Sequence, residues 1–470
     1  MMIDIIDRLR GWGSLDTLIV LTAALSAMAC ALPGVFLVLK RQSMMGDALS
    51  HTVLPGIVCA FLFAHALAVR GWISPASYDA AQHAIMMLGA AAIGVFSAVL
   101  TEWLQRVGRV EATAALGVVF TTLFALGLLL IRVAADNVHI DPDCVLYGTL
   151  EIAVYGQAGV PRAVWINGGV LSVNLVLVIA FYKELRVAAF DPALATTLGI
   201  PARGVHYVLM AMTAVTLVAA FESVGSILVI AMLIAPAATA SLLTERLSRM
   251  IGLSLIFAAA AAVVGHGMAI SLPPVLFSGV GFPSDGDAST AGMMAVACGS
   301  FFLAAVLFSP RQGVLGKILH AARFRLRIAA EDVLGSLYRH EEAANAAHGL
   351  PQARDQAQGI SPWLRRLATW RLTRQGLLAG TASSLHLTPA GQLAGEELVR
   401  SHRLWESYMA RHFPLPEDHL HDTAAVVEHY LGRELQEQLA EELESPATDP
   451  HGRAIPPVPA IPSQVADDKR

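Results

Sequence analysis

The sequence contains few cysteines, and they form no pattern typical of a disulfide framework or a structural zinc site. Four cysteines occur among 470 residues, and no two have the spacing of zinc ligands: Cys30, Cys59, Cys144 and Cys298. Charge is also scarce. Asp, Glu, Lys and Arg make up 15% of the chain, and the formal net charge of −5 is too small to indicate a class of partner.

Two catalytic motifs and a cleavable leader are also missing. GVLGK at 313–317 lacks the G-x-x-x-x-G-K-[S/T] spacing with which a P-loop holds phosphates, and HEEAA at 340–344 lacks the second histidine of H-E-x-x-H. The sequence therefore predicts no ATPase site and gives little support to a membrane metalloenzyme. Residues 1–16 carry several charges and no small-residue cleavage site, so we expect no cleaved signal peptide.

Apolar residues are abundant, and they are concentrated in the first two thirds of the chain. The hydrophobic fraction is 55% and the mean hydropathy is +0.57, which is too apolar for a soluble protein. Runs of Leu, Ile, Val, Ala and Gly recur through 17–308, whereas 311–470 is polar and has no run long enough to cross a bilayer. We therefore expect an all-α polytopic membrane domain followed by a mainly α-helical soluble domain.

The apolar runs predict about nine transmembrane helices, since a helix needs about 20 residues to cross the hydrocarbon core. Two of the segments are short, and FESVG at 221–225 leaves room only for a very tight turn, so counts of eight and ten stay open. The predicted segments are 17–39, 48–69, 85–105, 114–133, 164–182, 205–220, 224–243, 250–271 and 288–308.

Alternate loops between these segments are basic, which predicts their side of the membrane. By the positive-inside rule the basic loops are cytoplasmic, so nine spans place the N-terminus outside and the polar C-terminal part inside. The basic residues are Lys40, Arg41, Arg106, Arg109, Lys183, Arg186, Arg203, Arg246, Arg249, Arg311 and Lys317.

SMMGDALSHTVLPG, at 43–56, places a carboxylate and an imidazole in apolar surroundings. Asp47 and His51 are four residues apart and would share one face of a helix. A charge inside a bilayer costs about 2.5–3.5 kcal/mol on insertion scales, so the pair needs an explanation. One interpretation is that Asp47 caps the helix and His51 is an ordinary helix residue. The other is a weak, open site for Mn²⁺, Fe²⁺ or Zn²⁺ on a permeation path.

Four blocks of the membrane half, in order, resemble the ABC-type manganese/zinc/iron permeases. They are GVFLVLKRQSMMGDALSHTVLPGI at 34–57, DPDCVLYGTLE at 141–151, KELRVAAFDPALATTLGIPA at 183–202 and FESVGSILVIAMLIAPAATA at 221–240. The resemblance implies a permease subunit of an importer for a divalent transition metal ion, in a bacterial inner membrane. It also implies that Asp47 and His51 coordinate the ion on its path.

The same resemblance implies several partners. These are a separate ABC ATPase subunit, an extracytoplasmic metal-binding protein and a second permease subunit, identical or different. Membrane lipid surrounds such a protein. The cytoplasmic loop FDPALATTLGI has a short amphipathic pattern and is the expected docking element for the ATPase, with an ordinary connecting loop as the alternative. The expected docking residues are Phe190, Asp191, Pro192, Leu198 and Gly199.

Histidine and glutamate recur in the C-terminal part at helical spacing. His402 and Glu406 are four residues apart, and His421 opens a segment that also carries Glu428 and His429. Helices that bear these side chains are able to converge on a cation.

Two segments of the C-terminal part resemble the metal-binding and dimerisation domain of iron- and manganese-dependent repressors. They are LHLTPAGQLAGEELVRSHRLWESYM and the stretch from HLHDTAAVVEHYLGREL to about residue 456. The resemblance implies that His402, Glu406 and His421 form one metal site. It implies that Asp332, Glu428 and His429 form part of a second site, in which Ala425 replaces a ligand.

A DNA-reading segment precedes this domain in such repressors. Here SPWLRRLATWRLTRQGLLAG at 361–380 is at most a degenerate recognition helix, because PQARDQAQG before it has almost no apolar stripe. Its arginines suit DNA phosphates, but a basic surface near a membrane explains them as well, and DNA binding is the less favoured interpretation. They are Arg365, Arg366, Arg371 and Arg374.

The leading hypothesis is a metal-importer permease with a cytoplasmic metal-sensing domain that regulates transport. The alternative is a membrane-tethered, metal-dependent transcriptional regulator. We expect a permease domain, a basic juxtamembrane linker, a degenerate winged-helix-like segment, a repressor-like metal-binding domain and a Pro-rich disordered tail. Their expected bounds are 1–310, 311–330, 331–384, 385–456 and 457–470.

Overall fold

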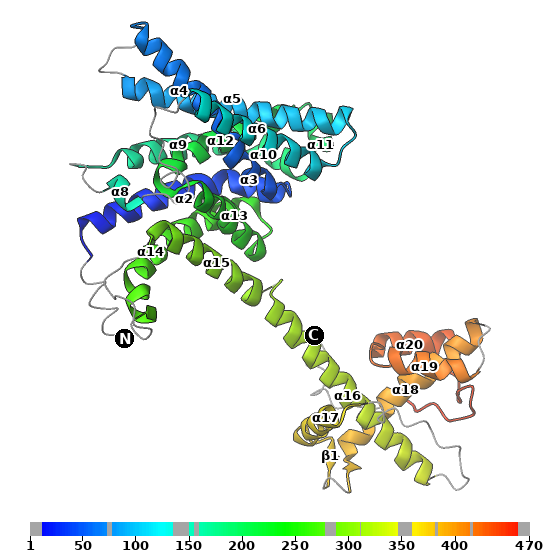
Figure 1. Ribbon diagram of the computed structural model, residues 1–470. Helices are drawn as coiled ribbons and strands as arrows, with labels where there is room; N and C mark the ends of the chain where they lie inside the picture. The colour runs from blue at the N-terminus through cyan, green and yellow to red at the C-terminus, as the bar shows by residue number, and fades with distance from the viewer. Residues whose placement is uncertain are drawn as a thin grey trace. The chain divides into compact units, whose positions relative to one another are not determined.

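The chain divides into two compact units, Met1–Gly316 and Lys317–Arg470, in the computed structural model (Figure 1). The structure describes residues 12–72, 78–134, 150–154, 159–277, 288–310, 312–345, 360–380, 384–413 and 417–458. Most of the sequence block 141–151, the polar segment 351–359 and nearly all of the predicted tail lie outside the described residues.

The first unit is built from helices, as the apolar runs predict. In chain order they are α2 (Ser14–Leu39), α3 (Ser43–Thr52), α4 (Leu54–Val69), α5 (Tyr78–Val107), α6 (Ala112–Ala134), α8 (Leu150–Val154), α9 (Arg162–Ala180), α10 (Tyr182–Phe190), α11 (Pro192–Thr197), α12 (Ala202–Val224), α13 (Ser226–Leu243), α14 (Leu247–Phe277) and α15 (Thr290–Phe308).

Eight stretches of described helix are long and apolar enough to cross a membrane, which is close to the predicted nine. The remaining predicted segment, 224–243, corresponds to α13, whose apolar stretch Leu228–Leu243 is shorter than the others. The predicted span 48–69 is made of two helices, since α3 ends at Thr52 and α4 begins at Leu54. Pro55 at the start of α4 has no backbone N–H, so it cannot continue the helical hydrogen bonds of α3.

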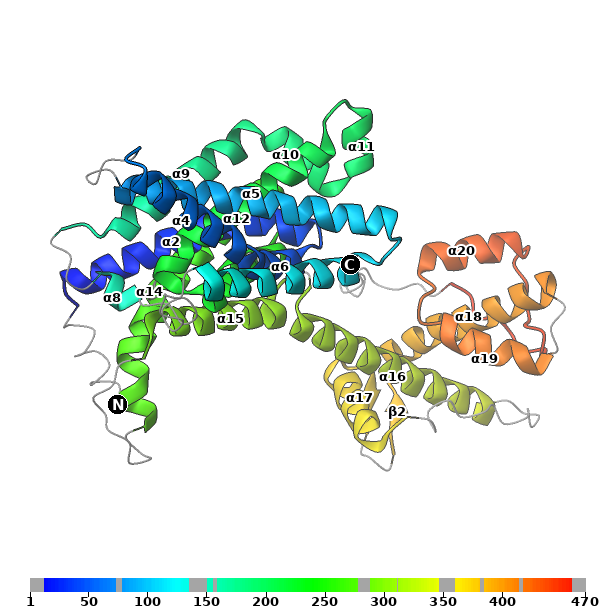
Figure 2. The same ribbon diagram turned by 45° about the horizontal axis from the view of Figure 1, so that its top comes forward.

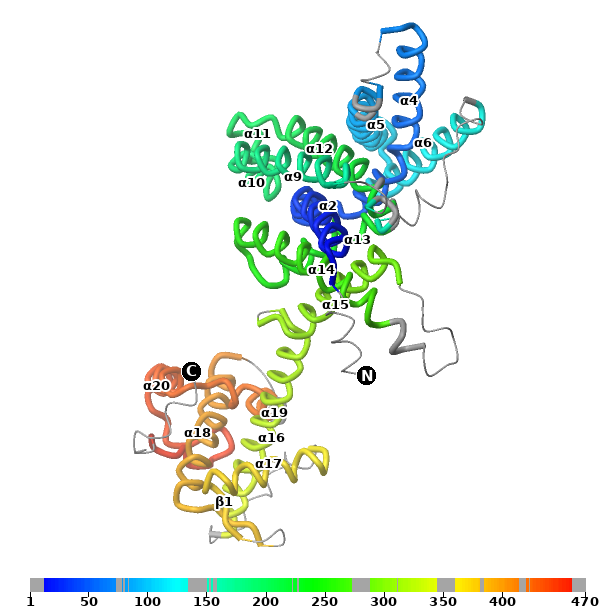
Figure 3. The backbone as a smooth tube through the Cα atoms, turned by 90° about the vertical axis from the view of Figure 1, so that its left-hand side faces the viewer, coloured from blue at the N-terminus to red at the C-terminus, as the bar shows by residue number. Residues whose placement is uncertain are grey.

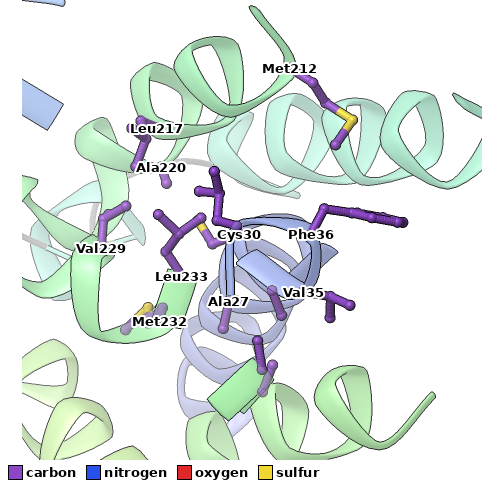
Figure 4. Close-up of a cluster of buried hydrophobic side chains, with 14 of the residues drawn as sticks. Ala27, Cys30, Val35, Phe36, Met212, Leu217, Ala220, Val229, Met232 and Leu233 are labelled. Atoms are coloured by element: carbon purple, nitrogen blue, oxygen red, sulfur yellow. The ribbon is translucent and has the colours of Figure 1, made fainter. Parts of the chain in front are cut away.

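Helix α2 lies at the centre of the first unit. It packs against α9, α12, α13 and α14, and Figures 2 and 3 show it running between these helices. Its most apolar window is 72% buried, whereas the other long spans range from 22% to 50%. The buried side chains of α2 include Ala27, Cys30, Val35 and Phe36, which belong to one buried cluster with Leu233 of α13, and Figure 4 shows Cys30 beside Leu233.

Two glycines of the first unit occupy positions where a side chain is disfavoured, one at a helix contact and one at a turn. A Cβ atom on Gly34 of α2 would lie 1.8 Å from the carbonyl oxygen of Leu233, so α2 and α13 touch backbone to backbone. Gly225 alone separates α12 from α13 and has φ +84° and ψ 155°, a conformation that side chains disfavour. The tight turn predicted at FESVG therefore rests on this single residue.

The second unit is mainly helical and contains one small sheet. Its helices are α16 (Val314–Asn345, which enters from the first unit), α17 (Pro362–Arg374), α18 (Pro389–His412), α19 (Glu417–Val427) and α20 (Arg433–Glu442). Strands β1 (Leu378–Ala379) and β2 (His386–Leu387) pair antiparallel, with Leu378 opposite Leu387. α17 and β1 fall within 331–384, the segment expected to be winged-helix-like, whereas β2 lies just beyond its end.

A core between α16, α17 and the ribbon holds the first part of this unit together. It includes Ala330, Val333, Ala368 and Leu372. Thr388 caps α18 by accepting a hydrogen bond from the N–H of Gly391 at 3.1 Å. α18 then runs beside α19 and α20 (Figure 2), and His429, which follows α19, contacts Glu331 on α16.

Candidate functional site

The membrane pair lies on α3. His51 Nε2 is 3.9 Å from Asp47 Oδ1, and the two side chains are 27% and 49% exposed. The His51 ring also packs against Phe120 and Phe124 of α6, with ring centroids 5.4 Å apart in both cases. The sequence therefore correctly places both side chains on one face. They offer one carboxylate and one imidazole to an ion.

The alternative role of Asp47 as a helix cap is wrong. α3 begins at Ser43 with Gln42 at its N-cap, and α4 has Val53 in that position. Asp47 therefore lies within α3, where backbone amides are already paired along the helix and have no need of a capping carboxylate.

His402, Glu406 and His421 come together in the second unit and form what we call the first cluster. His402 Nε2 lies 3.1 Å from Glu406 Oε1 and 2.9 Å from His421 Nδ1, and His421 Nδ1 lies 3.0 Å from the same Glu406 oxygen. His402 and Glu406 are buried on α18, whereas the His421 side chain on α19 is 25% exposed. Two imidazoles and a carboxylate at these distances are suited to a divalent transition metal ion.

Asp332, Glu428 and His429 form the second cluster, and their ligand atoms lie within 4.8 Å of one another. His429 Nε2 is 3.2 Å from Asp332 Oδ1. Glu428 Oε1 is buried and has no hydrogen-bond partner, which is unusual for a carboxylate oxygen. A bound cation would provide the missing partner. Ala425 has no side-chain atom that could bind a metal ion, so the second cluster offers three side-chain ligand atoms.

Each cluster has a histidine whose second ring nitrogen meets another carboxylate. His402 Nδ1 lies 2.5 Å from Glu428 Oε2, and His429 Nδ1 lies 2.8 Å from Glu331 Oε2. Outer carboxylates of this kind fix the ring orientation and tautomer of metal-ligating histidines. Glu428 therefore touches both clusters, with one oxygen on His402 and the other without a hydrogen-bond partner.

Hydrogen bonds within the clusters shift the pKa values of Glu406, His429 and His402. Burial by itself would raise the pKa of Glu406, yet hydrogen bonds with His402 and His421 hold it well below its usual range. Burial would lower the pKa of His429, but hydrogen bonds with Asp332 and Glu331 raise it to about 9. Glu406 and Glu428 likewise outweigh burial and raise the pKa of His402.

Sequence reasoning missed three residues at the clusters. Glu331 directly precedes Asp332, and no feature of the sequence singled it out in addition. Arg339 lies two turns further along α16, with Nη1 4.0 Å from Glu428 Oε2. His451 approaches the first cluster from the C-terminal loop, with Nε2 3.8 Å from Glu406 Oε1. The sequence DPHGR is typical of a turn, which could have indicated this loop. Asp449 accepts hydrogen bonds from the backbone N–H groups of His451 and Arg453 and so fixes the turn that carries His451.

The expected docking loop forms the pair α10–α11. Asp191 is the N-cap of α11 and accepts hydrogen bonds from the N–H groups of Ala193 and Leu194, each at 3.0 Å. Two of the predicted residues, Phe190 and Leu198, are 60% and 63% exposed. Pro192 is the first residue of α11, and Gly199 lies just after its C-cap. The predicted docking residues therefore lie at the two ends of one short, capped helix.

The predicted DNA-contacting arginines all lie on α17. Arg365, Arg366 and Arg374 are exposed, and Arg371 is partly buried. The apolar stripe that a preceding helix would need falls in 351–359, outside the described residues.

This sequence and fold are similar to those of known membrane transport proteins. Residues 16–309 match the family model described as the ABC 3 transport family. The manganese transport system membrane protein MntD of Bacillus subtilis is 40% identical over 65% of this chain and 96% of its own length. The chain belongs to the ABC 3 transport family. The zinc transport system membrane protein TroD of Treponema pallidum is 38% identical over 64% of this chain and 76% of its own length.

A solved structure supports the fold of the ABC 3 transport unit. PsaBC from Streptococcus pneumoniae, in complex with Fab, matches with a TM-score of 0.51 and 28% identity, over 66% of this chain and 98% of the solved chain. Residues 388–457 match a second family model, the iron dependent repressor metal binding and dimerisation domain. Both resemblances expected from the sequence are confirmed, and the chain is a multi-pass membrane protein of this family with a repressor-like domain appended.

Proposed function

We propose that this ABC 3 family member is the permease subunit of an importer for Mn²⁺, Fe²⁺ or Zn²⁺, and that Asp47 and His51 hold the ion in passage. The observation that carries the proposal is their pairing on α3, inside the range that matches the family. Relatives named for manganese and zinc transport support the class of cargo. A site with two side-chain ligands, both partly exposed, binds weakly enough to release its ion.

In this proposal ATP hydrolysis takes place on a separate subunit that docks at α10–α11. The exposed Phe190 and Leu198 offer apolar contact there, and Asp191 holds the short helix in shape. An extracytoplasmic metal-binding protein delivers the ion, and a second permease subunit completes the pore. The polar C-terminal unit is cytoplasmic in the orientation that the basic loops favour.

Metal content of whole cells tests the identity of the cargo. Cells that lack the gene should hold less of one metal among manganese, iron and zinc when that metal is scarce outside, and the intact gene should restore it. A complement with Asp47→Asn should fail, whereas a complement with His65→Gln, a histidine exposed on α4, should succeed. Equal content of all three metals with and without the gene would contradict the proposal.

We further propose that the second unit senses the same class of metal. The first cluster supports this role with three closely spaced ligands, and the second cluster supports it with the buried, unsatisfied Glu428 Oε1. His402, Glu406 and His421 would hold one ion, with His451 near enough to join, and Asp332, Glu428 and His429 would hold another. Bound metal would tie α18 and α19 together and link both to α16 through the second cluster.

A route from sensing to transport follows from the sequence of elements. α16 carries Glu331 and Asp332, and Val314 at its start follows Phe308 at the end of α15 by only six residues. Metal bound by the second cluster would therefore restrain a helix that is covalently continuous with the permease. We expect import to slow when cytoplasmic metal is abundant.

Metal titration of the full chain in detergent tests the sensing role. Mn²⁺, Fe²⁺ and Zn²⁺ are titrated into the protein and into a His402→Ala/His421→Ala variant, with His340→Ala, an exposed histidine outside both clusters, as the control. We expect the variant to lose at least one equivalent of binding. Identical stoichiometry and affinity in the parent and the variant would contradict a metal site at the first cluster.

A further inference from the structure

Helix α17 has one face that nothing in the described residues covers. Ala368 and Leu372 point into the core with α16, and they are 0% and 3% exposed. Trp363, Leu367 and Trp370 recur three and four residues apart on the opposite side and are 67%, 41% and 54% exposed. Arg366 and Arg374 are exposed and fall on the same side, so two indoles, a leucine and two arginines form a single stripe.

The charge on this helix is of one sign. Four of its thirteen residues are arginine and none is acidic. The Arg374 guanidinium lies 4.5 Å from the centroid of the Trp370 ring, so the cation and the aromatic surface are presented together. A surface of this kind suits a partner that is negatively charged at its rim and apolar just beneath.

We propose that α17 docks on an anionic lipid bilayer through the stripe formed by Trp363, Arg366, Leu367, Trp370 and Arg374. Tryptophan is enriched at the membrane–water interface, where its ring is buried and its N–H remains near the headgroups. Arginine at that depth meets lipid phosphates and carboxylates. Because the chain itself crosses the membrane, the bilayer is a permanent neighbour at high effective concentration.

Double-stranded DNA fits the same stripe poorly. A recognition helix reads base edges in the major groove with polar side chains, and phosphate contacts only position it. The centre of this stripe is formed by two tryptophans and a leucine. Apart from the indole N–H, these side chains have no donor or acceptor for hydrogen bonds to base edges. Docking on lipid would occupy the arginines that DNA contact would need.

Hydrogen exchange of the full chain in nanodiscs tests this proposal. Exchange of the α17 amides is compared in discs of phosphatidylcholine alone and in discs with about 30% phosphatidylglycerol. We expect exchange in 363–374 to be at least about tenfold slower in the anionic discs, because docking stabilises the helix against local opening. Trp363→Ser/Trp370→Ser should remove the difference, while Leu435→Ser on α20, 45% exposed in the parent, should keep it.

A second variant and a competing partner make the outcome decisive. Arg366→Gln/Arg374→Gln keeps both indoles and the buried face, and it should reduce the protection in anionic discs without changing exchange in the core of α16. Equal exchange in both kinds of disc would overturn the proposal. So would protection that appears only when duplex DNA of random sequence is added, since that result assigns the stripe to nucleic acid.

Discussion

At the scale of single residues, His402 and Glu428 connect the two clusters. His402 directs Nε2 to the first cluster and Nδ1 to Glu428, while Glu428 has a second oxygen without a hydrogen-bond partner. The ligand types and the i, i+4 pair were predictable from spacing. The contact between His402 and Glu428, 26 residues apart, was not, because it depends on how α18 packs against the chain after α19.

The raised pKa of His429 predicts a pH dependence. Its ring is protonated to about pH 9 in the metal-free protein, against an ordinary value of 6.5. The stabilising contact with Asp332 and Glu331 is therefore complete below pH 6.5 and is lost as pH rises through 9. A metal ion requires the neutral ring, so affinity at the second cluster should rise across the same window, with proton release.

Calorimetry at several pH values, in buffers of different ionisation enthalpy, measures both affinity and released protons. His429→Gln should remove the part of the pH dependence that belongs to the second cluster, and His340→Gln should leave it unchanged. Affinity that is flat between pH 6.5 and 9 in the parent protein would contradict this account of His429.

At the scale of elements, the apolar runs predicted the long helices of the first unit but not the interruption at Val53 or the central place of α2. Hydropathy reports how apolar a segment is and not which neighbours it meets, so the most buried helix looks like the others in sequence. The near contact of α2 and α13 depends on Gly34, whose Cβ would clash with the Leu233 carbonyl.

Substitution of this glycine should separate α2 from α13. Gly34→Ala cannot be accommodated by a flexible side chain, because the opposing atom belongs to the backbone, and overpacking of this kind typically costs about 1–3 kcal/mol or more. We expect a lower thermal midpoint in detergent and reduced transport. Gly169→Ala, which would meet nothing within 4 Å, is the control, and equal midpoints for both variants would show that the approach is not tight.

At the scale of the whole molecule, two families are joined in one chain, and the sequence alone indicated both. The joint is recognisable because apolar composition ends near 308 and histidine and glutamate become frequent afterwards. The convergence of α16 and the residues after α19 on the second cluster could not be read from spacing, since Asp332 and Glu428 are nearly one hundred residues apart.

The loop charges predict the side of the membrane on which the second unit lies. A reporter enzyme that is active only outside the cytoplasm, fused after Arg327, should be silent, because nine spans with basic loops inside leave the C-terminal part in the cytoplasm. A fusion of a cytoplasm-active reporter at the same position should give signal and serves as the matched control. Extracytoplasmic activity at Arg327 would overturn the nine-span orientation.

The central claim is that metal passes Asp47 and His51. The most direct test is the initial rate of uptake of radiolabelled Mn²⁺, Fe²⁺ or Zn²⁺ by cells that express the complete transporter, with Asp47→Ala, His51→Ala or the control His65→Gln in this chain. The account predicts at least about a tenfold loss of uptake for the first two at equal membrane expression, and no loss for the control. Uptake at the parent rate by both Asp47→Ala and His51→Ala would contradict it.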